Sequence, residues 1–192
     1  HHGTYIKIGN DLNIERKQDK EENMDFLDKR VGVICNELKK LKVKQVFPLT
    51  QWEYKEGNFI HPEDALKDEA AWENFDCKTM HWYGKDRHYW FRTTYTIPEE
   101  LDGKSVWIRV SSQIDEWDDG RNPQFIVFVN GEVYQGIDMN HRECLITRSG
   151  KAGETLTIDL QAYTGIMHEE FALRTQIEEI DAEIEKLYYD LW

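Results

Sequence analysis

A short apolar run that ends in Asn-Gly restricts the fold of this chain more than any other feature. Residues 124–129 read QFIVFV, Asn130 and Gly131 follow, and a second extended run covers residues 132–135. Asn-Gly readily supplies the two positive-φ residues of a type I′ turn, and that turn joins antiparallel strands. The sequence therefore predicts a β-hairpin around Asn130 and Gly131.

Other short runs with strand-like composition lie on both sides of this hairpin. We predict strands over residues 90–97, 105–111, 144–147 and 155–160, separated by turn-forming pairs such as Asp102-Gly103 and Ser149-Gly150. No helical pattern lies between these runs, which favours an antiparallel sheet over a parallel one. We expect a mainly β fold over residues 46–167: an antiparallel, jelly-roll-like β-sandwich of the galactose-binding-like kind.

Two amphipathic segments flank the expected sandwich, each with apolar residues at steps of three and four. The first predicts a helix over about residues 22–41, within a helical segment 4–45, and Val43, Val46 and Pro48 then mark a change to extended chain. The second predicts a helix over residues 168–192. The two apolar stripes are Leu27, Val31, Ile34, Leu38 and Leu41, and Leu173, Ile177, Ile180, Ile184, Leu187 and Leu191.

The ends of the sequence carry two further expectations. The opening His1-His2-Gly3 resembles the remnant of a purification tag, so residues 1–3 enter no argument about metal binding. The second stripe still continues at Leu191, with no helix-stopping signal after it. We therefore expect the C-terminal helix to lead into a further domain.

The length, charge and cysteine content of the chain exclude several classes of function. A chain of 192 residues suits one core, and 24 Lys and Arg against 37 Asp and Glu give a net charge of −13. That charge disfavours nucleic acid and anionic membrane surfaces as partners. No apolar run is long enough to span a bilayer. Three distant cysteines form no fully paired disulfide framework, which favours a reducing, cytoplasmic location.

Motifs for metal binding or catalysis are missing from the sequence. The available metal ligands match no zinc signature: Cys77, His81, His88, His141 and His168. The acidic run 115–120 does not fit an EF-hand loop, so a polar loop is favoured over a structural calcium site. No nucleophile elbow or phosphate-binding glycine loop appears. We therefore assign no catalytic residue, metal ligand or cofactor to this chain.

The aromatic and charged segment 80–90, MHWYGKDRHYW, is the first candidate binding site. Exposed Trp and Tyr rings stack on the apolar faces of sugars, while charged groups bind sugar hydroxyls. On this basis the candidate carbohydrate-binding residues are Trp82, Tyr83, Asp86 and, from the acidic run, Trp117. The alternative is that Trp82 and Trp90 fill the core of the sandwich.

The loop 135–141 is the second candidate, with Gln135, Asp138 and His141 as its polar residues. One interpretation is a local network in which Asp138 accepts hydrogen bonds from backbone N–H groups and from His141. The other places these residues at a domain interface or at the rim of a sugar-binding cleft. The two interpretations remain open at this point.

A set of motifs gives the chain a family resemblance. Trp82-Tyr83-Gly84, Trp90-Phe91-Arg92, Ile97-Pro98, Phe128-Val129-Asn130-Gly131-Glu132, Gln135-Gly136-Ile137-Asp138 and His141 follow one another in order, and Gly153-Glu154-Thr155-Leu156 and Leu187-Tyr188-Tyr189-Asp190-Leu191 come later. Over residues 46–191 this order resembles the amino-terminal domain of family-38 glycoside hydrolases, the α-mannosidases, in particular the cytosolic bacterial and fungal-vacuolar type.

The resemblance implies that catalysis belongs to a different domain from the β-sandwich. In that family the β-sandwich precedes a barrel that binds a divalent metal, usually zinc, and hydrolyses terminal α-mannosides with retention. The His-x-His-x-Asp motif of that barrel is absent from this sequence. The resemblance thus implies a non-catalytic domain whose partners are its own catalytic domain and a mannose-containing glycan. The alternatives are a free-standing carbohydrate-binding module and a structural domain that forms a homo-oligomer.

Overall fold

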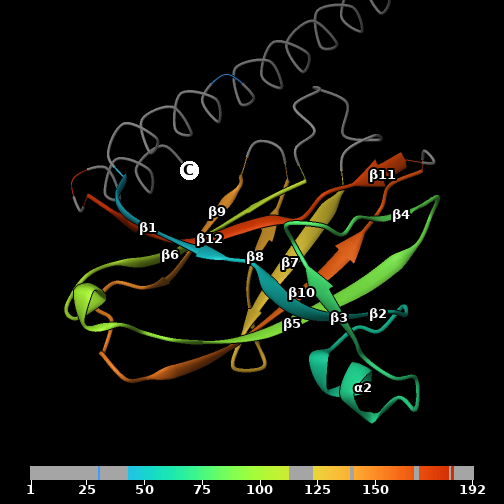
Figure 1. Ribbon diagram of the computed structural model, residues 1–192, viewed down its shortest axis with the longest axis horizontal. Coiled ribbons are helices and arrows are strands. Elements are labelled where there is room, and N and C mark those ends of the chain that lie inside the picture. Colours follow the sequence, from blue (N-terminus) through green and yellow to red (C-terminus); the bar gives the residue numbers. More distant parts are fainter. Residues whose placement is uncertain are drawn as a thin grey trace, which may run out of the picture.

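A computed structural model describes residues 30, 43–112, 123–138, 141–166, 169–181 and 183 of the chain. Strands dominate these residues (Figure 1). In chain order the elements are β1 (Val43–Leu49), β2 (Gln51–Glu56), α2 (Pro62–Lys67), β3 (Glu73–Asp76), β4 (Trp82–Gly84), β5 (His88–Thr96), η1 (Glu99–Leu101), β6 (Val106–Ser111), β7 (Gln124–Val129), β8 (Glu132–Ile137), β9 (Glu143–Thr147), β10 (Thr155–Tyr163), β11 (Glu169–Phe171) and β12 (Arg174–Ile180).

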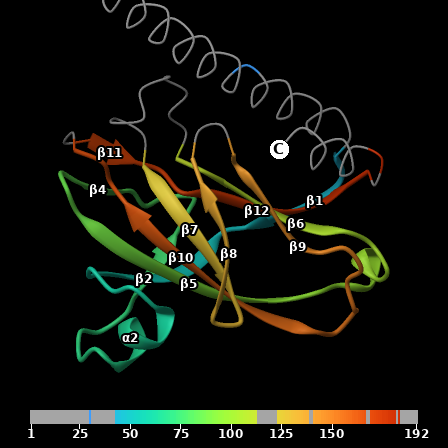
Figure 2. The same ribbon diagram turned by 180° about the vertical axis from the view of Figure 1, so that it is seen from behind.

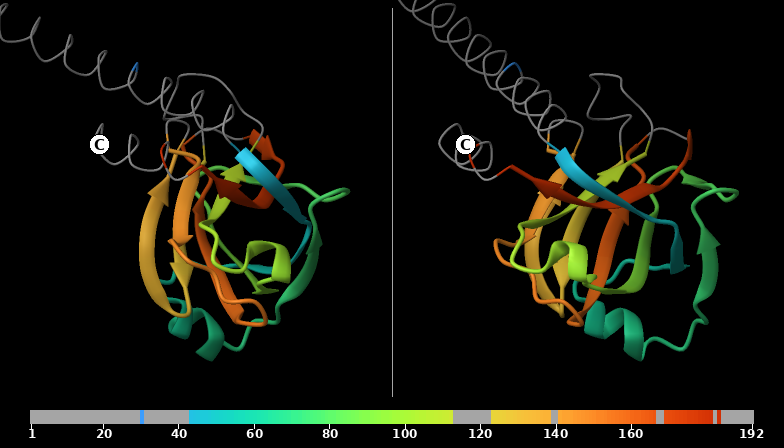
Figure 3. Two further views of the ribbon diagram at one scale, coloured as in Figure 1. Left: turned by 90° about the vertical axis from the view of Figure 1, so that its left-hand side faces the viewer. Right: turned by 60° about the vertical axis from the view of Figure 1, so that its left-hand side comes forward.

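The strands form two main antiparallel sheets that share one core. The four-stranded sheet has the order β1-β12-β6-β9, the six-stranded sheet has the order β3-β2-β5-β10-β7-β8, and β11 pairs with β4 in a small third sheet. Figure 3 shows the two layers from the side. The central cluster takes fully buried residues from both sheets, among them Phe91, Val127 and Leu160 from one and Ile108 and Ile177 from the other. The prediction of a mainly β fold with antiparallel sheets is confirmed, and its jelly-roll-like, galactose-binding-like form stays a prediction.

The hairpin and the other predicted strands are also confirmed. Asn130 and Gly131 have φ values of 51° and 83°, as a type I′ turn requires, and β7 pairs with β8 across them. β5, β6, β9 and β10 coincide with the four other predicted strands to within a few residues. These segments carry enough apolar residues between turn signals to fix their own conformation.

The predicted C-terminal helix is wrong over residues 169–180. These residues form β11 and β12, and β12 lies inside the four-stranded sheet, between β1 and β6. Ile177 packs in the central core, whereas Ile180 packs with Trp107 in a separate cluster. Because apolar residues are buried on both faces of this strand, their spacing imitates the three-four pattern of a helix.

The remaining helix predictions fall mostly outside the described residues. Arg30 is helical, and the other residues of the predicted helix 22–41 are not among those described, nor are residues 184–192. The predicted change to extended chain is confirmed, because β1 begins at Val43. Within the described part of the chain, no helix is long and apolar enough to span a membrane.

The short helix α2 and the chain on either side of it cover part of the outer face of the six-stranded sheet (Figure 2). Ala65 of α2 packs with Trp90 and Phe128 from the sheet, and Phe59 and Trp72 border this cluster. The Lys55 ammonium lies over the Trp72 ring at 4.9 Å and forms a 3.4 Å ion pair with Asp68. These contacts fix the segment that forms one wall of the pocket described next.

Candidate functional site

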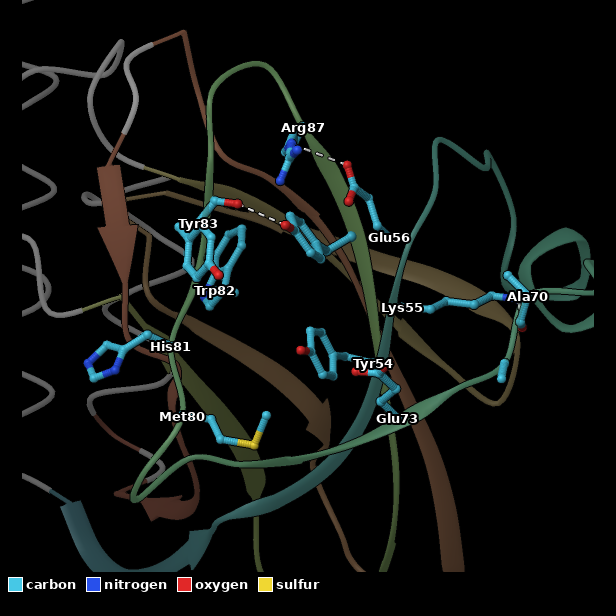
Figure 4. A pocket seen from close by; sticks show the side chains of 12 residues that line it. Tyr54, Lys55, Glu56, Ala70, Glu73, Met80, His81, Trp82, Tyr83 and Arg87 are labelled. Atoms are coloured by element: carbon cyan, nitrogen blue, oxygen red, sulfur yellow. Dashed lines mark hydrogen bonds and ion pairs between the residues drawn. The ribbon is translucent and has the colours of Figure 1, made fainter.

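A pocket of about 580 Å³ opens beside the edge of the six-stranded sheet. Its walls come from β2, the chain just before and within β3, β4 with the two residues before it, and the start of β5 (Figure 4). The polar and aromatic residues in its lining include Tyr54, Glu56, Glu73, His81, Tyr83 and Arg87. The volume lies within the range typical of small-molecule sites.

Aromatic rings give the pocket an apolar side. The Tyr54 ring stacks on Phe91 at 5.7 Å between centroids and meets the edge of Phe75 at 5.0 Å, which holds Tyr54 against the core. The Tyr89 hydroxyl donates a 2.8 Å hydrogen bond to the carbonyl of Tyr83 and fixes the backbone of β4 (Figure 4). The Tyr83 side chain remains 54% exposed. Tyr83 therefore offers an accessible ring on an anchored backbone.

Charged groups of both signs surround these rings. The Arg87 Nε atom lies 3.4 Å from a Glu56 carboxylate oxygen, and each side chain is about half exposed. His81 Nδ1 lies 3.6 Å from Glu170. Burial, and then the charge of Glu73, raises the pKa of Tyr54, so the Tyr54 hydroxyl keeps its proton at neutral pH. The pocket thus combines aromatic faces with hydrogen-bond donors and acceptors.

Trp82 does not have the position that sugar stacking requires. Its side chain is 1% exposed, it contacts the rings of Tyr89, Phe125 and Phe171, and its Nε1 donates a 3.1 Å hydrogen bond to the carbonyl of Ala172. Trp82 also lines the pocket, but a ring enclosed in this way offers a ligand very little surface. Its burial favours the alternative that Trp82 fills the core, and a carbohydrate-binding role for Trp82 stays a prediction.

The other three carbohydrate candidates are separated by the structure. Tyr83 lines the pocket, and Asp86 lies in the following turn, where its carboxylate accepts a 2.8 Å hydrogen bond from the Tyr163 hydroxyl. Asp86 is not among the residues that line the pocket. Trp117 lies outside the described residues. Tyr83 and Asp86 therefore stay predictions, and only Tyr83 has the pocket beside it.

Several pocket residues were not identified in the sequence. Tyr54 and Glu56 belong to β2 and Glu73 begins β3, two strands that the sequence pattern did not reveal. Arg87 falls inside the segment 80–90, so its composition gave a signal. Tyr54 and Glu73 gave none, because only the pairing of β2 with β5, and of β3 with β2, brings them beside that segment.

The loop candidates form local contacts. Asp138 Oδ1 accepts hydrogen bonds of 2.9 Å from the His141 backbone N–H and 3.1 Å from its ring Nδ1, while the Asp138 N–H donates to the His141 carbonyl at 3.2 Å. The Gln135 side chain donates to the carbonyl of Glu143 at 2.9 Å and ties β8 to β9, which belong to different sheets. This geometry supports the local network, and a role at a domain interface stays a prediction.

Replacing Asp138 with alanine should lower the free energy of unfolding of this chain by about 1 kcal/mol, because two hydrogen bonds to a carboxylate are lost. Asp138→Asn keeps an oxygen acceptor and should lose less. Urea unfolding of the three proteins measures both differences. Unchanged stability of Asp138→Ala would contradict a local role and leave the interface interpretation.

Metal and thiol chemistry find little support in the described part of the chain. No group of three or more His, Cys, Asp or Glu residues there could hold a metal ion. The His88 ring stacks on Tyr163 at 4.8 Å, and His168 lies outside the described residues. Burial raises the pKa of Cys77 to about 11, so its thiol stays protonated at neutral pH.

Comparison with known proteins gives distant likenesses. No family model matches the sequence. No curated protein matches it either. Among solved structures, a β-glucuronidase from Ruminococcus gnavus in complex with D-glucuronic acid matches 70% of this chain and 29% of its own, with 11% identity and a TM-score of 0.46. A β-galactosidase of Bacteroides fragilis, described as putative, matches 70% and 23%, with 19% identity and a TM-score of 0.47.

A β-glucuronidase from glycoside hydrolase family 2 matches 60% of this chain and 13% of its own, with 16% identity and a TM-score of 0.43. This chain spans less than a third of the length of each of these enzymes. Identities below 20% and TM-scores below 0.5 are too low to transfer an activity. These likenesses therefore assign no substrate or reaction to the chain.

Proposed function

We propose that this chain is a non-catalytic β-sandwich domain of a glycoside hydrolase, and that it binds carbohydrate weakly in the pocket beside β2, β4 and β5. The sequence resemblance to the amino-terminal domain of α-mannosidases supports the first part. The pocket supports the second. The parent enzyme in this proposal is an α-mannosidase.

The observation that best supports carbohydrate binding is that one pocket contains the exposed Tyr83 ring, the Glu56–Arg87 ion pair and the Tyr54 hydroxyl. A sugar ring presents C–H groups on its faces and hydroxyls at its rim. Tyr83 suits the faces. Carboxylate and guanidinium groups are planar, charged partners for adjacent hydroxyls. Both kinds of contact are available from the same side of the sheet.

The absence of a catalytic role follows from the sequence resemblance. In α-mannosidases of family 38 the metal and the nucleophile belong to a barrel, and the His-x-His-x-Asp motif of that barrel does not occur in this sequence. The proposal therefore gives hydrolysis to a separate catalytic domain of the parent enzyme. The pocket of this chain would hold a part of the glycan that does not react.

We expect methyl α-mannoside to bind the chain saturably with a Kd on the order of 1 mM. A titration monitored by NMR or calorimetry measures this binding. Tyr83→Ala should weaken binding by about threefold to tenfold through loss of the stacking surface. Tyr134→Ala is the matched control, because Tyr134 is 44% exposed on the distant edge strand β8. Absence of binding, or equal losses in both variants, would reject the pocket as a sugar site.

The choice of sugar tests the parent enzyme separately. Methyl β-glucuronide and methyl β-galactoside, titrated in the same way, should bind more weakly than methyl α-mannoside. The same preparations should not hydrolyse an aryl α-mannoside, with or without zinc. A clear preference for either β-linked sugar would keep the carbohydrate-binding pocket and reject the α-mannosidase parent.

A further inference from the structure

A second pocket, of about 380 Å³, lies where the chain passes from the four-stranded sheet to the six-stranded sheet. Thr50 links β1 to β2 at this point, and its carbonyl accepts a 2.8 Å hydrogen bond from the backbone N–H of Cys77. This pocket shares no lining residue with the first one. It is therefore a separate site in the fold.

Every charged residue that lines this second pocket is a cation. Arg109 comes from β6, Arg174 from the neighbouring strand β12, and Lys78 from the turn after β3. The register pairs Arg109 with Gln176 and Arg174 with Ser111, which places both arginines on one face of the sheet. Three positive charges from three segments thus surround one cavity, in a chain whose net charge is −13.

Carboxylates compensate only one of these charges. Arg109 Nη1 lies 2.6 Å from Glu143 Oε1, and Glu143 is 1% exposed, so this pair is close to neutral. Arg174 donates from Nη1 to the backbone carbonyls of Cys77 and Leu173, which carry no net charge. Within the part of the chain that the structure describes, neither Arg174 nor Lys78 forms an ion pair with a carboxylate.

The free donors of Arg174 suit a bidentate ligand. Both of its hydrogen bonds use Nη1, so Nη2 and Nε have no partner among the described residues. A guanidinium edge that carries two N–H donors matches two oxygens of one phosphate, and a lysine ammonium nearby adds a third contact. The Cys77 thiol beside the pocket stays protonated at neutral pH and adds no negative charge.

We propose that this second pocket binds a phosphate group, either inorganic phosphate or the phosphate of a small monoester, through Arg174 and Lys78. Arg109, already paired with Glu143, forms a positively polarised wall. Phosphate suits the site better than a carboxylate does, because it carries more charge and offers three oxygens to donors that come from separate segments. The inference does not depend on carbohydrate binding in the first pocket.

The test titrates the whole chain with sodium phosphate, and with sodium chloride at equal ionic strength, while thermal unfolding and NMR shifts are followed. Phosphate should raise the melting temperature saturably, and chloride should not. Glucose 6-phosphate tests the monoester: binding tighter than that of phosphate identifies an ester as the ligand, and equal binding identifies the phosphate group alone. Glucuronate should bind at least about tenfold more weakly.

Variants locate the site. Arg174→Gln and Lys78→Gln should each weaken phosphate binding by about tenfold or more, and Lys85→Gln, which removes a similar charge from an exposed turn, should not. Lys78→Gln keeps the test valid if Arg174→Gln does not fold, because Lys78 is exposed. Equal effects of phosphate and chloride, equal binding by the two lysine variants, or tighter binding of glucuronate would overturn the proposal.

Discussion

Replacing Trp82 with alanine is expected to lower the free energy of unfolding by about 3–5 kcal/mol, the range for removing a large buried aromatic side chain. Trp82 is 1% exposed, lies between 5.1 and 5.7 Å from four aromatic rings, and bonds the carbonyl of Ala172. Its removal leaves a cavity between the six-stranded sheet and β11. Urea unfolding at neutral pH measures the loss.

The neighbouring residue provides the control for this experiment. Tyr83→Ala changes an exposed side chain of the same strand and should alter stability by at most about 0.5 kcal/mol. Trp82→Phe keeps an aromatic ring at this position, so its loss of stability should lie between those of Tyr83→Ala and Trp82→Ala. A Trp82→Ala protein as stable as the wild type would mean that Trp82 is not part of the core, and would favour its role as a carbohydrate candidate.

The second large effect concerns Asp159, a carboxylate buried on β10 with 1% of its surface exposed. Burial raises the pKa of Asp159 from 3.8 to about 6. The positive charge of Arg92, whose Nη1 lies 3.4 Å from Asp159 Oδ1, lowers this pKa but only partly offsets the effect of burial. The folded protein therefore holds the Asp159 proton more tightly than the unfolded chain does. Its contribution to stability is largest at low pH and is lost as the pH rises through about 6.

Comparison with Asp159→Asn isolates this contribution. The stability of the variant relative to the wild type should increase by about 2 kcal/mol between pH 4 and pH 7.5, because the asparagine has no proton to lose. Asp64→Asn, on an exposed position of α2, serves as the control for the loss of one carboxylate. A difference that stays constant over this pH range, or that changes in the opposite direction, would contradict the raised pKa.

Local sequence signals were sufficient to predict the strands that have turn-forming residues at their ends. Asn130-Gly131 fixed one hairpin through backbone conformation alone, and the runs on either side of Pro98 and Gly150 each had strand composition between turn residues. These features act over a few residues, so they can be read without knowledge of the partner strand.

Segments without such local signals were missed. β2 and β3 consist mostly of polar and charged residues, each strand buries one aromatic ring almost completely, Trp52 or Phe75, and neither strand has a marked turn at both ends. β12 was assigned to a helix because it is buried on both faces. Its conformation depends on β1 and β6, which pair with it from far away in the sequence.

The sequence by itself determined the antiparallel strands, the hairpin and the acidic, aromatic-rich character of the chain, because turn chemistry and composition are local properties. Only the tertiary structure decided which aromatic residues are available to a ligand. Trp82 and Tyr83 are neighbours with the same composition signal, yet Trp82 is 1% exposed and Tyr83 is 54% exposed. Both pockets likewise depend on strand pairing, since Tyr54 meets Tyr83, and Arg109 meets Arg174, only when distant segments lie side by side.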